Sequence, residues 1–235
     1  RISFQGDVSG YLDQLKAFGT LDTDDGIVRT DMLFGFNTKE KVFSHAKGKI
    51  YTTHFNLGHF LENDKLGEIS FSLALNFKKP LYKDFKGEVK GIVENFDFKG
   101  YRYENISLDV LYADKKVDGA LLIDDENGLL KLDGLLDLTD QKFPVLNLAA
   151  KIKDVQLDKL NLAPKLEASY LSLNINADLI GSTVDNVQGY ISIDSLEFYK
   201  QREEFKLNNL LVKASGLFEN KDRKVEISSD LLNGY

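Results

Sequence analysis

Three histidines and one acidic run are the residues of this chain best suited to bind a metal ion, and neither set has the required spacing. His45, His54 and His59 lack the i, i+4 separation that places two imidazoles on one face of a helix. Residues 22–26 (DTDDG) resemble the start of a calcium loop, but the glycine comes one position early and Leu33 stands where a bidentate glutamate is required. We therefore expect no metal site and no cofactor.

Catalytic signatures are also missing from the sequence. It contains no glycine-rich phosphate loop, no nucleophile elbow and no cysteine. The carboxylates lie in turns or at the polar positions of alternating runs, as solvated residues do. We therefore expect a protein that is not an enzyme. A β-scaffold enzyme acting on polysaccharide stays an alternative, and it would require carboxylates clustered on a concave face.

The charge balance disfavours nucleic acid as a partner. The net charge is −7 and is spread along the chain, so no basic stripe exists that would neutralise phosphates. The same acidic balance disfavours docking on an anionic bilayer surface.

Short runs that alternate apolar and polar residues fill most of the chain. In residues 129–139, leucines at even positions alternate with Lys131, Asp133 and Asp137 at odd positions, and residues 171–179 repeat the pattern. Successive side chains of a strand point to opposite faces, so each run predicts a strand with one apolar and one wet face.

Turn residues between the runs set the topology. Acidic turns at 24–26, 124–128 and 220–222 are short, and short connections imply antiparallel neighbours. No linker rich in proline, glycine or serine divides the chain, so we expect one elongated, repetitive β domain over 1–235, cut from a longer protein. The predicted strands are 2–10, 27–36, 47–55, 69–77, 85–98, 106–112, 117–123, 129–139, 146–153, 168–180, 187–199, 206–217 and 224–232.

Three local irregularities are also predicted. The alternation changes parity after Ile193, which indicates a β-bulge near Ser195. Segments 56–61 and 155–160 have apolar residues three or four apart, and we interpret both as single helical turns that plug one end of the sheet. An irregular loop is the alternative for each.

These patterns predict an all-β protein with an elongated, mainly antiparallel sheet that has one extended apolar face. An open groove on this face would accommodate acyl chains, whereas a structural spacer or adhesin module would instead have a dry, packed core. The residues predicted to line the lipid groove are Ile106, Leu108, Val110, Leu130, Leu132, Leu136, Leu138, Leu171, Leu173, Ile175, Leu179, Ile191 and Ile193.

Several segments of the sequence resemble those of a known protein family. These are 118–123 (DGALLI) with 128–138 (GLLKLDGLLDL), 55–61 (FNLGHFL) with 65–73 (KLGEISFSL), and 189–199 (GYISIDSLEFY). Together they resemble the TamB proteins (translocation and assembly module subunit) of the AsmA-like superfamily, in a divergent form with an Asn-Leu-Gly helical turn. The resemblance extends through essentially the whole chain.

This resemblance implies a large protein of the bacterial periplasm, anchored in the inner membrane and reaching the outer one. Its repeated strands would curl into a trough called a β-taco, which conducts phospholipid and supports outer-membrane assembly. An outer-membrane barrel protein of the TamA type is the implied partner of the intact protein. The family has no catalytic residues to transfer to this sequence.

Overall fold

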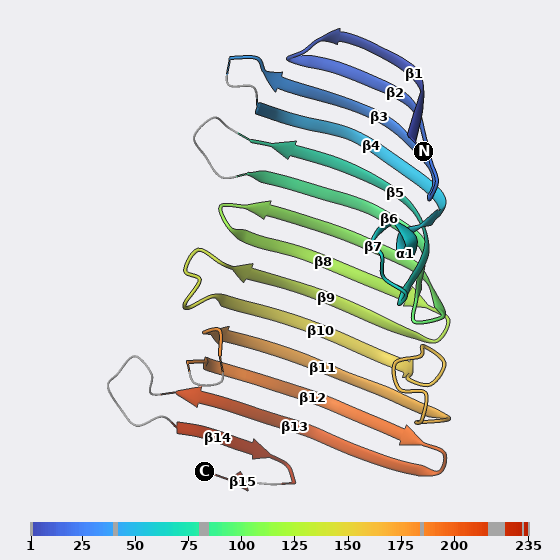
Figure 1. Ribbon diagram of the computed structural model, residues 1–235. Helices are drawn as coiled ribbons and strands as arrows, with labels where there is room; N and C mark the ends of the chain where they lie inside the picture. Colours follow the sequence, from blue (N-terminus) through green and yellow to red (C-terminus); the bar gives the residue numbers. More distant parts are fainter. Residues whose placement is uncertain are drawn as a thin grey trace. The chain divides into compact units, whose positions relative to one another are not determined.

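The computed structural model describes residues 2–39, 42–79, 85–183, 186–215, 224–231 and 233–234. These residues form antiparallel strands joined by short connections, with a single turn of α-helix (Figure 1). The chain divides into two compact units, Arg1–Asp114 and Lys115–Tyr235. The prediction of an all-β, open, antiparallel curled sheet is confirmed, whereas the single domain over 1–235 stays a prediction.

Unit 1 is a meander in which each strand pairs with the next one along the chain. Its elements are β1 (Ile2–Tyr11), β2 (Gln14–Thr23), β3 (Gly26–Asn37), β4 (Val42–Asn56), α1 (Leu57–Phe60), β5 (Leu66–Lys78), β6 (Lys86–Phe98) and β7 (Tyr101–Ala113).

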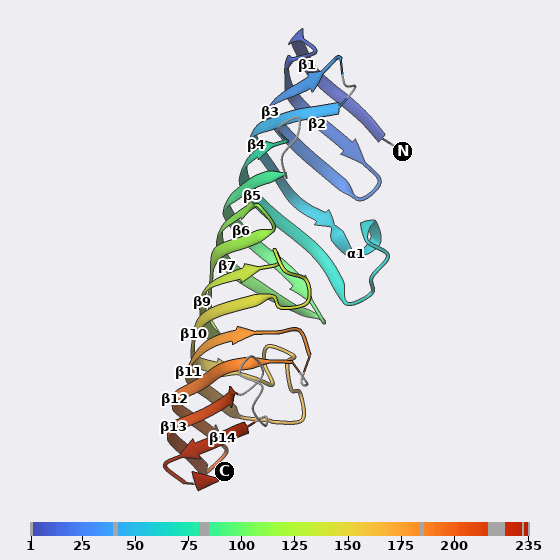
Figure 2. The same ribbon diagram turned by 90° about the vertical axis from the view of Figure 1, so that its left-hand side faces the viewer.

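Unit 2 has the same meander topology. Its elements are β8 (Lys116–Asp125), β9 (Gly128–Asp137), β10 (Val145–Gln156), β11 (Ser169–Ile180), β12 (Gln188–Lys200), β13 (Glu203–Ser215), β14 (Lys224–Ser229) and β15 (Asn233–Gly234). The strands curve along their length within each unit (Figure 2).

Strand β2 is absent from the sequence prediction because its alternation is weak. Ala17 and Gly19 stand at positions of its apolar face, while the bulky Phe18 points to the other face. Small residues on the apolar side and an aromatic on the polar side reduce the contrast on which the period-2 pattern depends. Strand β15, also missed, is too short to show any alternation.

The predicted helical turns have different outcomes. Segment 56–61 contains α1, but Phe60 and Leu61 are exposed, so this turn does not plug the sheet. Segment 155–160 is not a helix: residues 155–156 end β10, and residues 157–160 form a hydrogen-bonded turn in which the Leu160 N–H donates to Gln156 O at 3.0 Å. Leu160 is buried there, as a plug would be. The bulge predicted near Ser195 is confirmed by its φ of 55° and by a register shift in the β11–β12 pairing.

One face of unit 1 is apolar because the register aligns apolar residues from strand to strand. Met32 lies opposite Gly48, Gly48 opposite Leu75, and Leu75 opposite Val89. On the other face, one position along, the aligned residues are Asp31, Lys49, Ala74, Lys90 and Asp109. A register slip of one residue would exchange the two faces, so the pattern fixes the pairing.

Neither apolar face is covered by a second layer in the described part of the chain. The extensive contacts of each strand are with its neighbours in the sheet, and α1 contacts β5. Fully buried apolar side chains are therefore few, and most of the inward residues are half-buried.

Gly48 provides a test of how tightly the strands of unit 1 approach each other. It has φ of 155°, and a Cβ added there would lie 2.8 Å from the Met32 Cα. We expect Gly48→Ala to lower the free energy of unfolding by about 1–3 kcal/mol because backbone strain of this kind costs that much. Gly134→Ala is the matched control, since its φ is not positive and its Cβ would lie no closer than 3.1 Å to any atom, the nearest being Asn147 O and then Leu148 Cδ1 at 3.2 Å. Chemical denaturation of both variants measures the difference, and equal losses would contradict the expectation.

Candidate apolar binding groove

An open groove lies on the apolar face of unit 1, over β1 to β5. Its volume is about 710 Å³, within the ~300–1,000 Å³ of typical small-molecule sites. Thr30 supplies the single polar side chain of the lining. The lining residues are Phe4, Val8, Leu15, Ala17, Leu21, Val28, Thr30, Met32, Phe34, Phe36, Phe43, Ala46, Ile50, Leu75 and Phe77.

Phe34, Phe36, Phe43 and Phe77 gather at one end of the groove, and Phe4 lies towards the other end, opposite Leu21. Phe43 contacts Phe36 and Phe34 edge to face, with ring centroids 5.2 and 6.1 Å apart. Phe77 stacks on Phe85 at 5.5 Å. Rigid aromatic walls hold the end of the groove open because the rings have few rotamers to lose.

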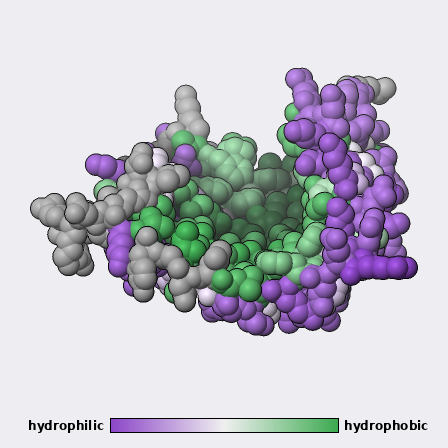
Figure 3. Space-filling view, turned by 90° about the horizontal axis from the view of Figure 1, so that it is seen from below, coloured by the Kyte–Doolittle hydropathy of each residue, from purple (hydrophilic) through white to green (hydrophobic). Residues whose placement is uncertain are grey.

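The groove is open to solvent along its length. Val8 is 55% exposed and Phe4 42%, although Met32 is only 4% exposed. Contact between this apolar surface and water is unfavourable, and free energy is released when something apolar covers the surface. The space-filling view shows an apolar hollow with hydrophilic residues on the outside (Figure 3).

The predicted lining residues of β7 lie on the same face as this groove but outside its wall. Ile106 is opposite Val93, Leu108 opposite Gly91, and Val110 opposite Val89. Their role as a lipid lining stays a prediction.

In unit 2, the register also brings nearly all predicted lining residues to one face. Ile193 pairs with Ile175, Ile175 with Ala150, and Ala150 with Leu132. The other predicted residues on this face are Leu130, Leu136, Leu171, Leu173, Leu179 and Ile191. The polar set (Lys131, Asp133, Asp137, Asn174, Asn176 and Asp178) takes the opposite parity, so the predicted separation of faces is confirmed.

Leu138 lies just beyond the end of β9. The strand ends at Asp137, whose Oδ1 accepts a hydrogen bond from the Thr139 N–H at 2.9 Å. The Leu138 N–H still donates to Lys115 O at 2.9 Å, and the role of Leu138 as a lipid lining stays a prediction. The Lys116 ammonium beside Asp137 lowers the pKa of its carboxyl to about 2.

The sequence analysis missed the groove of β1 to β5. Its polar–apolar alternation is present in β3, where Val28, Thr30, Met32 and Phe34 share a parity. Thr30 interrupts the apolar series there, and glycines interrupt it in the adjacent strands. Only the register shows that these positions form one continuous surface.

Charged residues concentrate on the polar side of unit 1. Arg102 Nε lies 2.7 Å from Asp97 Oδ1, and its guanidinium also reaches Glu68 Oε2 at 3.4 Å. His54 Nδ1 lies 2.9 Å from the same Glu68 oxygen. Arg102 holds the pKa of Asp97 below its ordinary value. Within the described ranges, no group of three histidine, aspartate or glutamate side chains is placed to hold a metal ion.

Comparison with known proteins gives no match: no family model, curated protein or solved structure resembles the chain closely enough to identify it. None of the helices in the described residues is long and apolar enough to cross a membrane.

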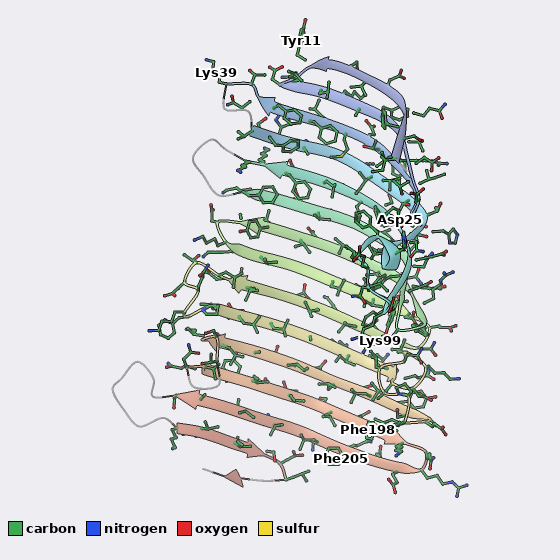
Figure 4. The ribbon with its side chains drawn as sticks, in the orientation of Figure 1. Tyr11, Asp25, Lys39, Lys99, Phe198 and Phe205 are labelled. Atoms are coloured by element: carbon green, nitrogen blue, oxygen red, sulfur yellow. The ribbon has the colours of Figure 1, made fainter. Side chains whose placement is uncertain are left out.

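The contact between His59 and Asp25 predicts a pH dependence. His59 Nδ1 hydrogen-bonds to Asp25 Oδ1 and so ties α1 to the β2–β3 turn. Figure 4 labels Asp25 in this turn. Hydrogen bonding and the charge of Asp25 raise the pKa of His59, with smaller contributions from Asp24 and Glu62. The contact therefore stabilises α1 fully below pH ~6.5, the ordinary value, and this stabilisation is lost as the pH rises through the raised pKa.

An NMR titration of the histidine ring protons tests this contact. We expect Asp25→Asn to return the pKa of His59 towards its ordinary value. An unchanged His59 titration in this variant would show that Asp25 is not its partner in solution.

Proposed function

We propose that the chain binds hydrocarbon chains of phospholipids in its apolar groove and works as a segment of a lipid conduit between membranes. The single observation that carries the proposal is the open groove of unit 1, about 710 Å³ in volume, with Thr30 as the one polar side chain of its wall. Beyond Thr30, the wall has no polar side chain to orient a headgroup, so the apolar part of a ligand supplies the binding energy.

The energetics favour a long, uniform ligand. Each methylene removed from water contributes ~0.8 kcal/mol, so a sixteen-carbon chain would gain on the order of 12 kcal/mol before the costs of ordering. A wall of aliphatic and aromatic side chains interacts about equally with each methylene. An acyl chain could therefore slide along the surface without a large step in energy, as a conduit requires.

The alternative from another class, a structural spacer with a dry core, is less well supported. A dry core requires facing layers of side chains at native density. The apolar face of unit 1 instead has Phe4 and Val8 about half exposed, and no second layer lies over it in the described residues.

The wider role rests on the resemblance to the TamB proteins. By that resemblance, the chain belongs to a periplasmic protein anchored in the inner membrane, and an outer-membrane barrel of the TamA type is its partner. The apolar groove is compatible with this role, because phospholipid acyl chains that cross an aqueous compartment need a continuous apolar surface.

Two adjacent positions of β5 test the proposal. Leu75→Asp places a carboxylate in the groove wall, and we expect it to abolish binding of a fluorescent fatty acid. The free energy of unfolding should fall by roughly 1–3 kcal/mol only, because the open groove lets the carboxylate reach water. Fluorescence titration and thermal unfolding measure the two effects.

Ala74→Asp is the matched control, with the same change of charge on the opposite face. Position 74 pairs with Lys49 and Lys90, so an aspartate there has cationic neighbours. We expect it to bind fatty acid as the wild type does. Undiminished binding by Leu75→Asp would reject the groove as the lipid site, and complete unfolding of that variant would favour a dry core.

A further inference from the structure

The β2–β3 and β8–β9 hairpins have the same construction, although they lie roughly a hundred positions apart in the chain. Thr23 pairs with Gly26 in the first hairpin, and Asp125 pairs with Gly128 in the second. In each, the side-chain oxygen of the first residue accepts a hydrogen bond from the N–H two positions later, at 3.2 Å in the first and 2.9 Å in the second.

The strands that follow carry the same bulge. The register shifts after Thr52 in the β4–β5 pair and after Ile152 in the β10–β11 pair. His54 and Asp154 have φ of 54° and 51°.

Each bulge is held by the same hydrogen bond from the next strand. The His54 N–H donates to Ser70 Oγ at 3.0 Å, and the Asp154 N–H donates to Ser172 Oγ at 2.8 Å. A bulge leaves an N–H outside the ladder, so a serine at this position supplies the acceptor in both units.

The backbone hydrogen bonds at the ends of these strands also correspond between the two units. The Asn56 N–H donates to Asp25 O at 2.6 Å, and the Gln156 N–H donates to Asn127 O at 2.8 Å. At the opposite ends, the Lys79 N–H donates to Ser44 O at 2.8 Å and the Gly181 N–H to Pro144 O at 2.9 Å.

The next turns also correspond. The β6–β7 and β12–β13 hairpins each have two residues between the paired strand ends, and the first of them has a positive φ, 51° at Lys99 and 56° at Gln201. Six consecutive strands, β2 to β7, therefore have counterparts in β8 to β13.

We infer that the chain contains two copies of one six-strand module and that unit 2 carries a second acyl-chain site equivalent to the groove of unit 1. This inference rests on the proposed function. It adds that the ligand class is bound twice, at corresponding places in the two units.

The lining residues of β3 have apolar counterparts in β9 of unit 2. Val28 and Thr30 correspond to Leu130 and Leu132, and Phe34 corresponds to Leu136. These leucines share the apolar face of β9.

Within corresponding cross-strand pairs, the large and the small residue swap strands between the two copies, so the volume of the pair at the apolar face is similar. Met32 faces Gly48 in unit 1, whereas the corresponding pair in unit 2 is Gly134 facing Leu148. In each pair the glycine leaves room for its large neighbour, as shown by the distances that an added Cβ would have to Met32 Sδ (2.9 Å) and Leu148 Cδ1 (3.2 Å). Exchange within a facing pair preserves volume, which is the change that packed surfaces tolerate best.

The two sites differ in one property. Phe34 and Phe77 of the unit 1 groove are replaced by Leu136 and Leu179, so unit 2 presents aliphatic side chains where unit 1 presents aromatic rings. Both surfaces suit a saturated hydrocarbon, since neither contributes a charged group at these positions.

Native mass spectrometry of the full chain with palmitic acid tests the second site. We expect two fatty acids bound to the wild type, and one each to Thr30→Asp and Leu132→Asp, which change corresponding positions. The double variant should bind none. Asn174→Asp is the control on the polar face of unit 2, opposite Lys151, and should bind two.

The outcomes separate the two hypotheses. A wild type that binds one fatty acid, lost in Thr30→Asp but retained in Leu132→Asp, would overturn the second site and keep the first. A wild type that binds none would reject the proposed function itself.

A second measurement avoids variants that fold poorly. Photo-crosslinking of the wild type with a diazirine-bearing fatty acid should label peptides of both β2–β5 and β8–β11. Labelling confined to β2–β5 would overturn the second site, and no labelling above a heat-denatured control would reject acyl binding.

Discussion

The constraint on which the rest of the structure depends is that each unit is a single layer of sheet. In a two-layer protein, the apolar face of a sheet is buried against another element. Here the strands contact mainly their neighbours in the ladder, and the inward side chains stay half-buried in the described residues. The backbone ladder must therefore supply most of the order, and the uncovered face is left with surface free energy that an apolar ligand can release.

The polar face contributes specificity more than stability. Lys90 lies 2.9 Å from Asp109 Oδ2 and 3.3 Å from Glu88 Oε1, and all three side chains are well exposed. Exposed ion pairs of this kind contribute little to the free energy of unfolding. Their alternation across neighbouring strands nevertheless penalises a shifted register, because a one-residue slip would place these charges on the apolar face.

The shape of the apolar face depends on how large and small side chains are paired across neighbouring strands. At Met32 and Gly48 the bulk comes from β3, and at Gly134 and Leu148 it comes from β10. The surface is thus a property of facing pairs and not of single positions. This explains how two modules with little similarity in residue type present comparable surfaces, one with aromatic rings at its end and one with aliphatic side chains.

The sequence by itself determined the fold class, most strands and the face on which residues such as Leu132 and Ile175 lie, because the period-2 alternation is a local property of the extended chain. Only the tertiary structure decided three further features. It ended β9 at Asp137, whose carboxylate accepts a hydrogen bond from the Thr139 N–H. It formed the groove over β1 to β5, where small residues such as Ala17 obscure the pattern. It also aligned Ser70 with the bulge at His54 and Ser172 with that at Asp154, since cross-strand register joins residues distant in sequence.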